Sequence, residues 1–362
     1  MASPFPFLVL FFVSVLSLAS AELPSHIVLV AGGDKNAVNL PATEAKLQEP
    51  FGTDVDSHGN LWIVEMETGG RLLRVDSKGE LMHWAGHPKT AVSGHNGLGL
   101  QAEFKGAHNL AVLPNGNILI ADTFDSRLKE VNAGTGAVSI SPLEKPPGAK
   151  PFCIALGPLL GDQSHMVDPP SPNQVYMVDL SRAYVIDLRT HHFKVLAGNG
   201  KKGVPQDGAV AVDAPLVDPR AIAPDYEGNV YILERGGNAL RVVDPSGHIR
   251  TVVNASGKKG ATGDGGPALQ ATMNGPKHLC VDLDGSVIIA DAENNLVRRY
   301  NPKDGMMTRV AGVGGRGGSA GVGGDPKQCQ LSRPHGVTVN AKTGELYITD
   351  SYNNRVLKIV KD

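Results

Sequence analysis

An acidic residue closes a short apolar run six times along this chain, at intervals of 55 to 59 residues. The six positions are Glu65, Asp122, Asp179, Glu234, Asp291 and Asp350. Self-similarity at a fixed period of this order is typical of an array in which one supersecondary unit repeats. Although 362 residues would suffice for two domains, the repeat predicts one continuous array.

Each unit contains the signals of four short strands. In the last unit, a run after Pro334 is followed by a glycine turn at Gly344, by a β-rich run that ends at Asp350, and by an alternating run over residues 355–359. Other units add a fourth run that closes on Val-Ala-Gly, as at residues 310–312. Short strands joined by glycine turns predict a four-stranded antiparallel meander. Six such blades arranged radially form an all-β, six-bladed β-propeller.

The two ends of the array complement each other. Residues 27–32 look like a fourth strand placed before the first unit, and the chain stops after a third strand, at Val360. We therefore expect the N-terminal strand to complete the last blade, which leaves no open sheet edge. The predicted propeller comprises residues 22–362.

Residues 1–21 are interpreted as a segment separate from the propeller. Residues 7–18 are apolar except for two serines, and Ala19-Ser20-Ala21 has the small-x-small form of a signal peptidase site. The sequence predicts a cleaved signal peptide, a mature chain that starts at Glu22, and a secreted or periplasmic protein.

The charge is nearly balanced, with 34 basic and 36 acidic side chains and no basic block. This balance argues against a nucleic-acid or membrane-surface partner. The three cysteines have spacings that match no zinc or redox motif, and we expect no disulfide. We further expect a monomer.

Several short motifs resemble those of the NHL-repeat proteins. The matching elements are Pro334-His335-Gly336-Val337, Tyr347-Ile348-Thr349-Asp350, the set Asp350, Asn353 and Arg355, and the glycine-rich loop at residues 263–268. The resemblance implies a six-bladed propeller over the whole mature chain. It implies no single function, since NHL propellers include extracellular sensor domains, RNA- and protein-binding modules, and a few enzymes.

One position of the repeat varies far more than its neighbours. It is the residue after the proline-like start of each first strand: Phe51, His108, Phe152, Arg220, Lys277 and His335. Propeller sites usually surround one end of the central channel, where we expect these six side chains to converge. Two cations and two imidazoles could hold an anion, or a metal with an anionic ligand, because histidine is the commonest transition-metal ligand. The alternative is that they merely solvate a wet channel.

Two distant resemblances bear on a metal. Peptidyl-hydroxyglycine amidating lyases are similar propellers that hold zinc with histidines after such a proline on alternating blades. His108 and His335 match this position on blades 2 and 6, but blade 4 has Arg220, and a catalytic zinc normally needs three protein ligands. Gluconolactonase-like propellers use an acid at a blade start, and no blade start here has one. The cofactor therefore stays open, with a divalent metal as the candidate.

The six repeated acids are expected to be structural. A carboxylate in every copy can accept hydrogen bonds from amides of the following turn and from a downstream side chain, as with Asn353 and Arg355, or Asp125 and Arg127. The alternative is a cation bound by some of the acids.

We interpret the chain as an exported binding module that takes a small anionic ligand or a protein at its channel mouth. The alternative is a hydrolase or lyase for a small anionic substrate, with or without a metal. In that case Arg220 and Lys277 would clamp the anion, and His108 or His335 would act as general base.

Overall fold

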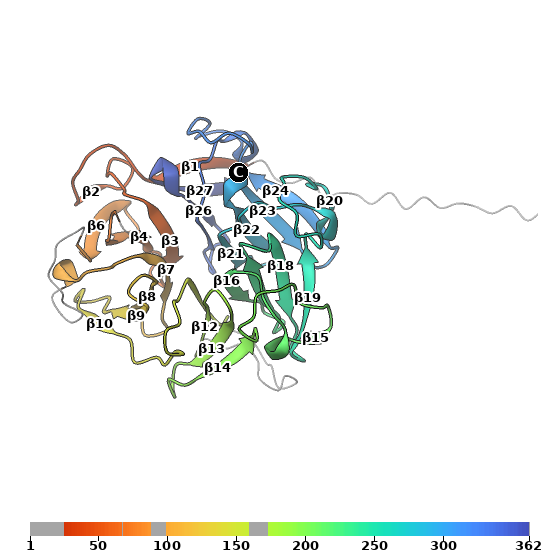
Figure 1. Ribbon diagram of the computed structural model, residues 1–362. Coiled ribbons are helices and arrows are strands. Elements are labelled where there is room, and N and C mark those ends of the chain that lie inside the picture. The colour runs from red at the N-terminus through yellow and green to blue at the C-terminus, as the bar shows by residue number, and fades with distance from the viewer. Residues whose placement is uncertain (1–24, 67, 88–98, 159–172, 362) are drawn as a thin grey trace, which may run out of the picture.

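The computed structural model describes residues 25–66, 68–87, 99–158 and 173–361, and in these residues the chain forms six antiparallel sheets around one axis (Figure 1). Each sheet is a blade built from consecutive strands, apart from the last. The predicted all-β, six-bladed propeller is confirmed. The predicted signal peptide, residues 1–21, lies outside the described residues.

The first three blades follow the chain order. Blade 1 consists of β3 (Pro50–Val55), β4 (Leu61–Glu65), β5 (Leu72–Val75) and β6 (Glu80–Ala85), with β2 (Leu40–Pro41) at its outer edge. Blade 2 consists of β7 (Ala107–Val112), β8 (Ile118–Asp122), β9 (Arg127–Val131) and β10 (Val138–Ile140). Blade 3 consists of β11 (Cys153–Leu156), β12 (Gln174–Val178), β13 (Ala183–Asp187) and β14 (Phe193–Ala197).

The last three blades repeat the plan. Blade 4 consists of β16 (Pro219–Pro224), β17 (Val230–Glu234), β18 (Ala239–Val243) and β19 (His248–Val253), with β15 (Ala209–Val210) at its edge. Blade 5 consists of β21 (His278–Val281), β22 (Val287–Asp291), β23 (Leu296–Asn301) and β24 (Met306–Ala311), with β20 (Gly266–Pro267) at its edge. Blade 6 consists of β25 (Gly336–Val339), β26 (Leu346–Asp350), β27 (Arg355–Lys361) and β1 (Ser25–Ala31).

The helices of the described residues are short 3-10 turns in the loops. They are η1 (Gly99–Gln101), η2 (Ala211–Asp213), η3 (Ala268–Gln270), η4 (Ala292–Asn294), η5 (Pro326–Gln328) and η6 (Ser351–Asn353). None of the described helices is long and apolar enough to cross a membrane.

Three blades have a fifth strand that the sequence did not predict. The short strands β2, β15 and β20 each pair with the fourth strand of the blade that follows them in the chain. The loop that enters a blade passes along its outer edge, and two residues of the loop pair with the exposed strand there. This pairing covers an edge that would otherwise be open.

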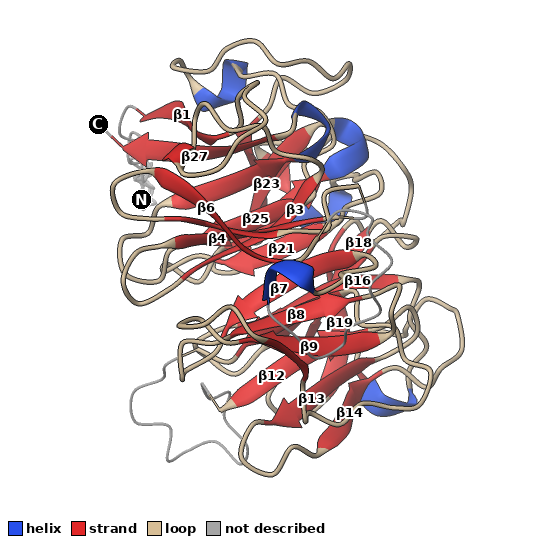
Figure 2. Cartoon of the chain, turned by 90° about the vertical axis from the view of Figure 1, so that its left-hand side faces the viewer, coloured by secondary structure: helices blue, strands red, loops and turns tan. Residues whose placement is uncertain are grey.

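The ring closes as the two chain ends predict. β1 pairs antiparallel with β27 from Ser25 with Lys361 to Ala31 with Val356, and the two strands lie side by side in Figure 2. The first strands of neighbouring blades also contact one another in a closed circuit: β3, β7, β11, β16, β21, β25 and again β3. These six inner strands enclose the axis and set the positions of the candidate site.

The core lies between the blades, and the repeat explains it. The residue two positions before each repeated acid is fully buried: Ile63, Ile120, Met177, Ile232, Ile289 and Ile348. Burial of such side chains stabilises by about 1.5–3 kcal/mol each. The three cysteines are free and contribute to this packing without a disulfide.

Candidate functional site

The variable residue stands at the start of each inner strand, and in three blades it lies in a β-bulge. In blades 1, 2 and 4 the register shifts at this point, so that Phe51, His108 and Arg220 are extra residues in the ladder. In the other blades, the N–H of the variable residue donates to a carbonyl of the second strand. The acceptor belongs to the residue that pairs with the next residue of the inner strand. The donors are Phe152, Lys277 and His335. A bulge re-aims a side chain without ending the sheet. We call the end of the axis where these six residues lie the mouth.

Five of the six side chains at the mouth contact one another, and together with Lys277 they form what we call the floor. The Phe51 ring stacks on His335 with 4.1 Å between centroids and meets His108 edge-on at 5.5 Å. His108 also contacts Phe152 at 5.1 Å, and the Arg220 guanidinium carbon lies 4.0 Å from the Phe152 ring centre. The structure thus brings together residues that are up to 284 positions apart, from Phe51 to His335.

Both imidazoles of the floor are neutral at neutral pH. Nδ1–H of His108 donates to the Gly106 carbonyl at 3.2 Å, and Nδ1–H of His335 donates to the Arg333 carbonyl at 2.8 Å. Burial and the charge of Arg220 lower the pKa of His108 to about 3. Burial and the charge of Lys277 hold the pKa of His335 well below its usual value. Each imidazole is therefore a weak base.

The cations of the mouth are crowded and poorly neutralised. Burial and the neighbouring Arg235 and Arg220 lower the pKa of Lys277 to about 8, and its Nζ is 3.6 Å from Glu293. Arg220 donates from Nη2 to Nε2 of His108 at 3.3 Å. Within the part of the chain that the structure describes, no carboxylate lies within ion-pair distance of Arg220. A partly buried cation without a carboxylate is uncommon, because buried charges are normally paired.

A rim that the sequence interpretation missed surrounds the floor. The residue two positions after the repeated acid contacts the floor residue of its own blade: Phe124 lies 5.4 Å from His108, and Tyr352 lies 5.9 Å from His335, between ring centroids. Glu293 has the same offset and pairs with Lys277. The repeat contained this signal, since all three residues share one position in it.

Arg333 joins two of these rim residues. Its guanidinium carbon lies 4.7 Å from the Tyr352 ring centre, and its Nη1 donates to the Tyr352 hydroxyl at 2.6 Å. Its Nη2 also pairs with Glu293. The rim next to blades 5 and 6 is therefore held in place by a small network.

A second layer lies directly beneath the floor. It includes His278, one residue after Lys277, and Asn109, one residue after His108. Asn109 donates from Nδ2 to His278 Nε2 at 3.0 Å, across the axis from blade 2 to blade 5. Asn109 also accepts a hydrogen bond from the Ile154 N–H, at 3.0 Å. These contacts support the floor from below.

The repeated acids are buried and paired, as expected, but their backbone partners differ from the prediction. The carboxylates of Glu65, Asp122, Glu234, Asp291 and Asp350 accept from an amide 17 or 18 residues earlier, in the loop that enters the blade. In the part of the chain that the structure describes, Asp179 alone among the six accepts from amides of the following turn, those of Ser181 and Arg182. The acids therefore anchor each blade's entering loop.

The side-chain partners come from the third strand. Arg241 donates to Glu234 at 2.8 Å, and Arg355 donates to Asp350 at 2.7 Å, as Asn353 also does. In blade 2 the partner of Asp122 is Lys129, at 2.7 Å, because Lys129 points inward and Arg127 does not; Arg127 lies near Asp125 instead. In the described residues, none of these acids joins a group of three or more metal-binding side chains.

The floor does not suit a transition metal. Phe51 lies between His108 and His335, and Arg220 donates to the only available nitrogen of His108. The described residues hold no cluster of three or more His, Cys, Asp or Glu side chains that could bind a metal. A cationic, aromatic surface with two separated imidazoles fits an anion better than it fits a divalent cation.

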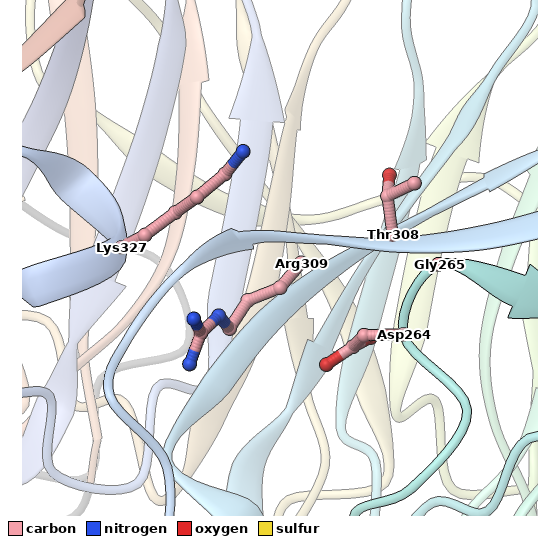
Figure 3. A pocket seen from close by; sticks show the side chains of 5 residues that line it. All are labelled: Asp264, Gly265, Thr308, Arg309 and Lys327. Carbon is pink, nitrogen blue, oxygen red and sulfur yellow. The ribbon is translucent and has the colours of Figure 1, made fainter.

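A hollow of about 630 Å³ lies away from the mouth, on the outside of blade 5 (Figure 3). Asp264, Thr308, Arg309 and Lys327 line it. In Figure 3 the side chains of Arg309 and Lys327 point away from each other, and Asp264 accepts from Arg298 at 2.8 Å. These groups do not converge on a common point as the mouth residues do.

A six-bladed ring whose blades share one set of buried acids defines a repeat propeller. The family model described as "NHL repeat" matches residues 331–359, which form most of blade 6. The match shows an NHL repeat in blade 6, and the structure shows a six-bladed β-propeller around it.

Known proteins are similar to this chain in sequence or in fold. Human Teneurin-1 is 26% identical over 207 residues, a match that covers 52% of this chain but only 7% of Teneurin-1. An auxiliary nutrient binding protein from Bacteroides thetaiotaomicron has a TM-score of 0.66 at 15% identity, over 94% of this chain and 78% of that one. A streptogramin B lyase has a TM-score of 0.52 at 12% identity, over 93% and 98%. At such identities the structural likeness shows the fold alone.

Proposed function

We propose that this NHL propeller is an exported binding module that holds a small anionic ligand at its mouth. The observation that carries the proposal is Arg220, a partly buried guanidinium with no carboxylate partner in the described residues. A ligand anion would supply the missing charge. Lys277, whose pKa is lowered to about 8 by burial and by the neighbouring Arg235 and Arg220, is the second group that would bind it.

Binding is favoured over catalysis by the state of the imidazoles. A general base works best when its pKa lies near the working pH. His108, with a pKa of about 3, and His335, with a pKa well below its usual value, do not meet this condition. The fold itself leaves the choice open, since a nutrient binding protein and a lyase share it.

One experiment tests export and binding together. The full chain is expressed in a secreting host, and the protein recovered from the medium is analysed by intact mass; a chain that begins at Glu22 is expected. The same protein is titrated with phosphate and with small carboxylates by calorimetry. Arg220→Met should weaken anion binding at least tenfold, because a charge-assisted contact is worth about 1.5–3 kcal/mol.

The matched control is Arg309→Met. It removes the same charge from the outer hollow of Figure 3 and should leave anion binding unchanged. Equal losses in the two variants would mean that anions respond to overall charge and not to the mouth, and the proposal would be wrong. If residues 1–21 were retained in the mature protein, the proposal that the protein is exported through a cleaved signal peptide would be wrong.

A further inference from the structure

The mouth is divided into an aromatic half and a cationic half. Five rings form a continuous arc of contacts over blades 2, 1 and 6: Phe124 with His108, His108 with Phe51, Phe51 with His335, and His335 with Tyr352. Arg220 and Lys277 lie opposite, on blades 4 and 5. The two halves meet where Arg220 contacts His108.

The arc is open to solvent at both ends. Phe124 is 49% exposed and Tyr352 is 51% exposed, whereas the three rings between them are only partly exposed. Scattered exposed aromatics need no explanation, but these two stand at the same repeat position and each touches an imidazole of the floor. Their placement makes one connected aromatic surface and not two separate exposed side chains.

The arc has no charge of its own near neutral pH. The Nδ1–H groups of His108 and His335 are used by backbone carbonyls, and both rings stay neutral. Neutral rings present flat faces and polar edges that favour offset-stacked or edge-to-face contact with another ring. Two cations border the arc: Arg333 lies over Tyr352 and is paired with Glu293, whereas Arg220 contacts His108 and has no carboxylate within ion-pair distance in the described residues.

We propose that the ligand of the mouth is an aromatic carboxylate, whose ring lies on the arc of Phe124, His108, Phe51, His335 and Tyr352 while its carboxylate pairs with Arg220 and Lys277. This inference rests on the proposed anion-binding function and adds the chemical class of the anion. Because Arg220 touches a member of the arc, the carboxylate belongs close to the ring, as in benzoate.

The test compares three anions of equal charge by calorimetry on the mature protein. Benzoate and cyclohexanecarboxylate are similar in size, but only benzoate is aromatic; acetate reports the anion alone. Benzoate should bind about tenfold more tightly than cyclohexanecarboxylate, since aromatic pairing adds up to about one order of magnitude beyond area burial. Phe124→Ala with Tyr352→Ala should reduce this preference, because it removes the two most exposed rings of the arc and leaves the three rings between them.

The outcomes separate the two proposals. Tyr226→Ala removes a 37% exposed aromatic from the turn between β16 and β17, and it should leave the benzoate preference intact. If benzoate and cyclohexanecarboxylate bound equally well and acetate still bound, the proposal of an aromatic ligand would be wrong and the proposal of an anion site would stand. If none of the three anions binds, both proposals fail. The comparison in the unaltered protein does not depend on whether any variant folds.

Discussion

Two rings of six side chains lie at the same end of this propeller, and they obey opposite rules. The acids that end the second strands are almost uniform, fully or nearly fully buried, and each is bonded to its own blade. The residues that start the inner strands differ from blade to blade, and they contact other blades across the axis. The ring of acids repeats the same contacts within each blade, whereas the residues of the mouth form one surface from several blades.

The contrast separates stability from function. A position whose task is local can carry the same residue in each copy, because each blade needs its entering loop tied to its second and third strands. In blade 3 the buried acid has a neutral partner: Asp179 accepts from the Tyr184 hydroxyl at 2.9 Å in place of a cation. The acid therefore needs a hydrogen-bond donor from the third strand, and this donor can be charged or neutral. A position whose side chains meet on the axis can present different groups on different sides of one surface, which suits a ligand with two unlike ends.

The largest expected effect is the loss of one repeated acid. Glu234→Ala would leave Arg241, which is 2% exposed, as an unpaired buried cation and would deprive the Val217 N–H of its acceptor. Breaking a buried pair in this way costs about 3–5 kcal/mol. Urea unfolding followed by tryptophan fluorescence would measure the loss.

The control for this prediction is an ion pair nearer the surface. Glu345→Ala breaks the pair with Lys358, whose side chain is 24% exposed, and should cost under about 1 kcal/mol. If the two variants lost equal stability, the repeated acids would have no special structural role, and the contrast between the rings would disappear.

A smaller effect is expected from His278 when the pH falls. Burial lowers the pKa of His278 to about 4, below the value of about 6.5 in an unfolded chain. Between these values the unfolded state binds the extra proton, so His278 destabilises the fold progressively as the pH drops from 6.5 to 4. The expected slope is about 1.4 kcal/mol per pH unit.

The variant His278→Gln isolates this contribution. Glutamine can accept from Asn109 and donate to the Val337 carbonyl, as His278 does, without titrating. Urea unfolding at pH 7, 6 and 5 should give similar free energies for the two proteins at pH 7 and a growing advantage for the variant below pH 6.5. Parallel curves would show that His278 does not couple folding to protonation.

The repeat predicted most of the fold because each blade is formed by one continuous segment of sequence, and the same pattern occurs in six such segments. The strands, the buried residue before each acid, and the closure by residues 27–32 all follow from it. The floor residues could be named but their contacts could not, because Phe51 and His335 meet only when the ring closes. The hydrogen bond between Asn109 and His278 also joins two blades, so no pattern within a single repeat indicates it. The rim was missed because Phe124, Glu293 and Tyr352 share no chemistry, only a position.

The smallest expected effect has the opposite sign to the first. Arg220→Met removes a cation that has no carboxylate partner in the described residues, and methionine retains much of the packing against Phe152. Urea unfolding without added anions should therefore show stability that is unchanged or higher by up to about 1 kcal/mol, the usual sign when a functional side chain is removed. Saturating benzoate should reverse the order, since a ligand stabilises only the protein that binds it. A loss of more than about 2 kcal/mol without anions would instead place Arg220 with the repeated acids, as part of the framework that holds the blades together.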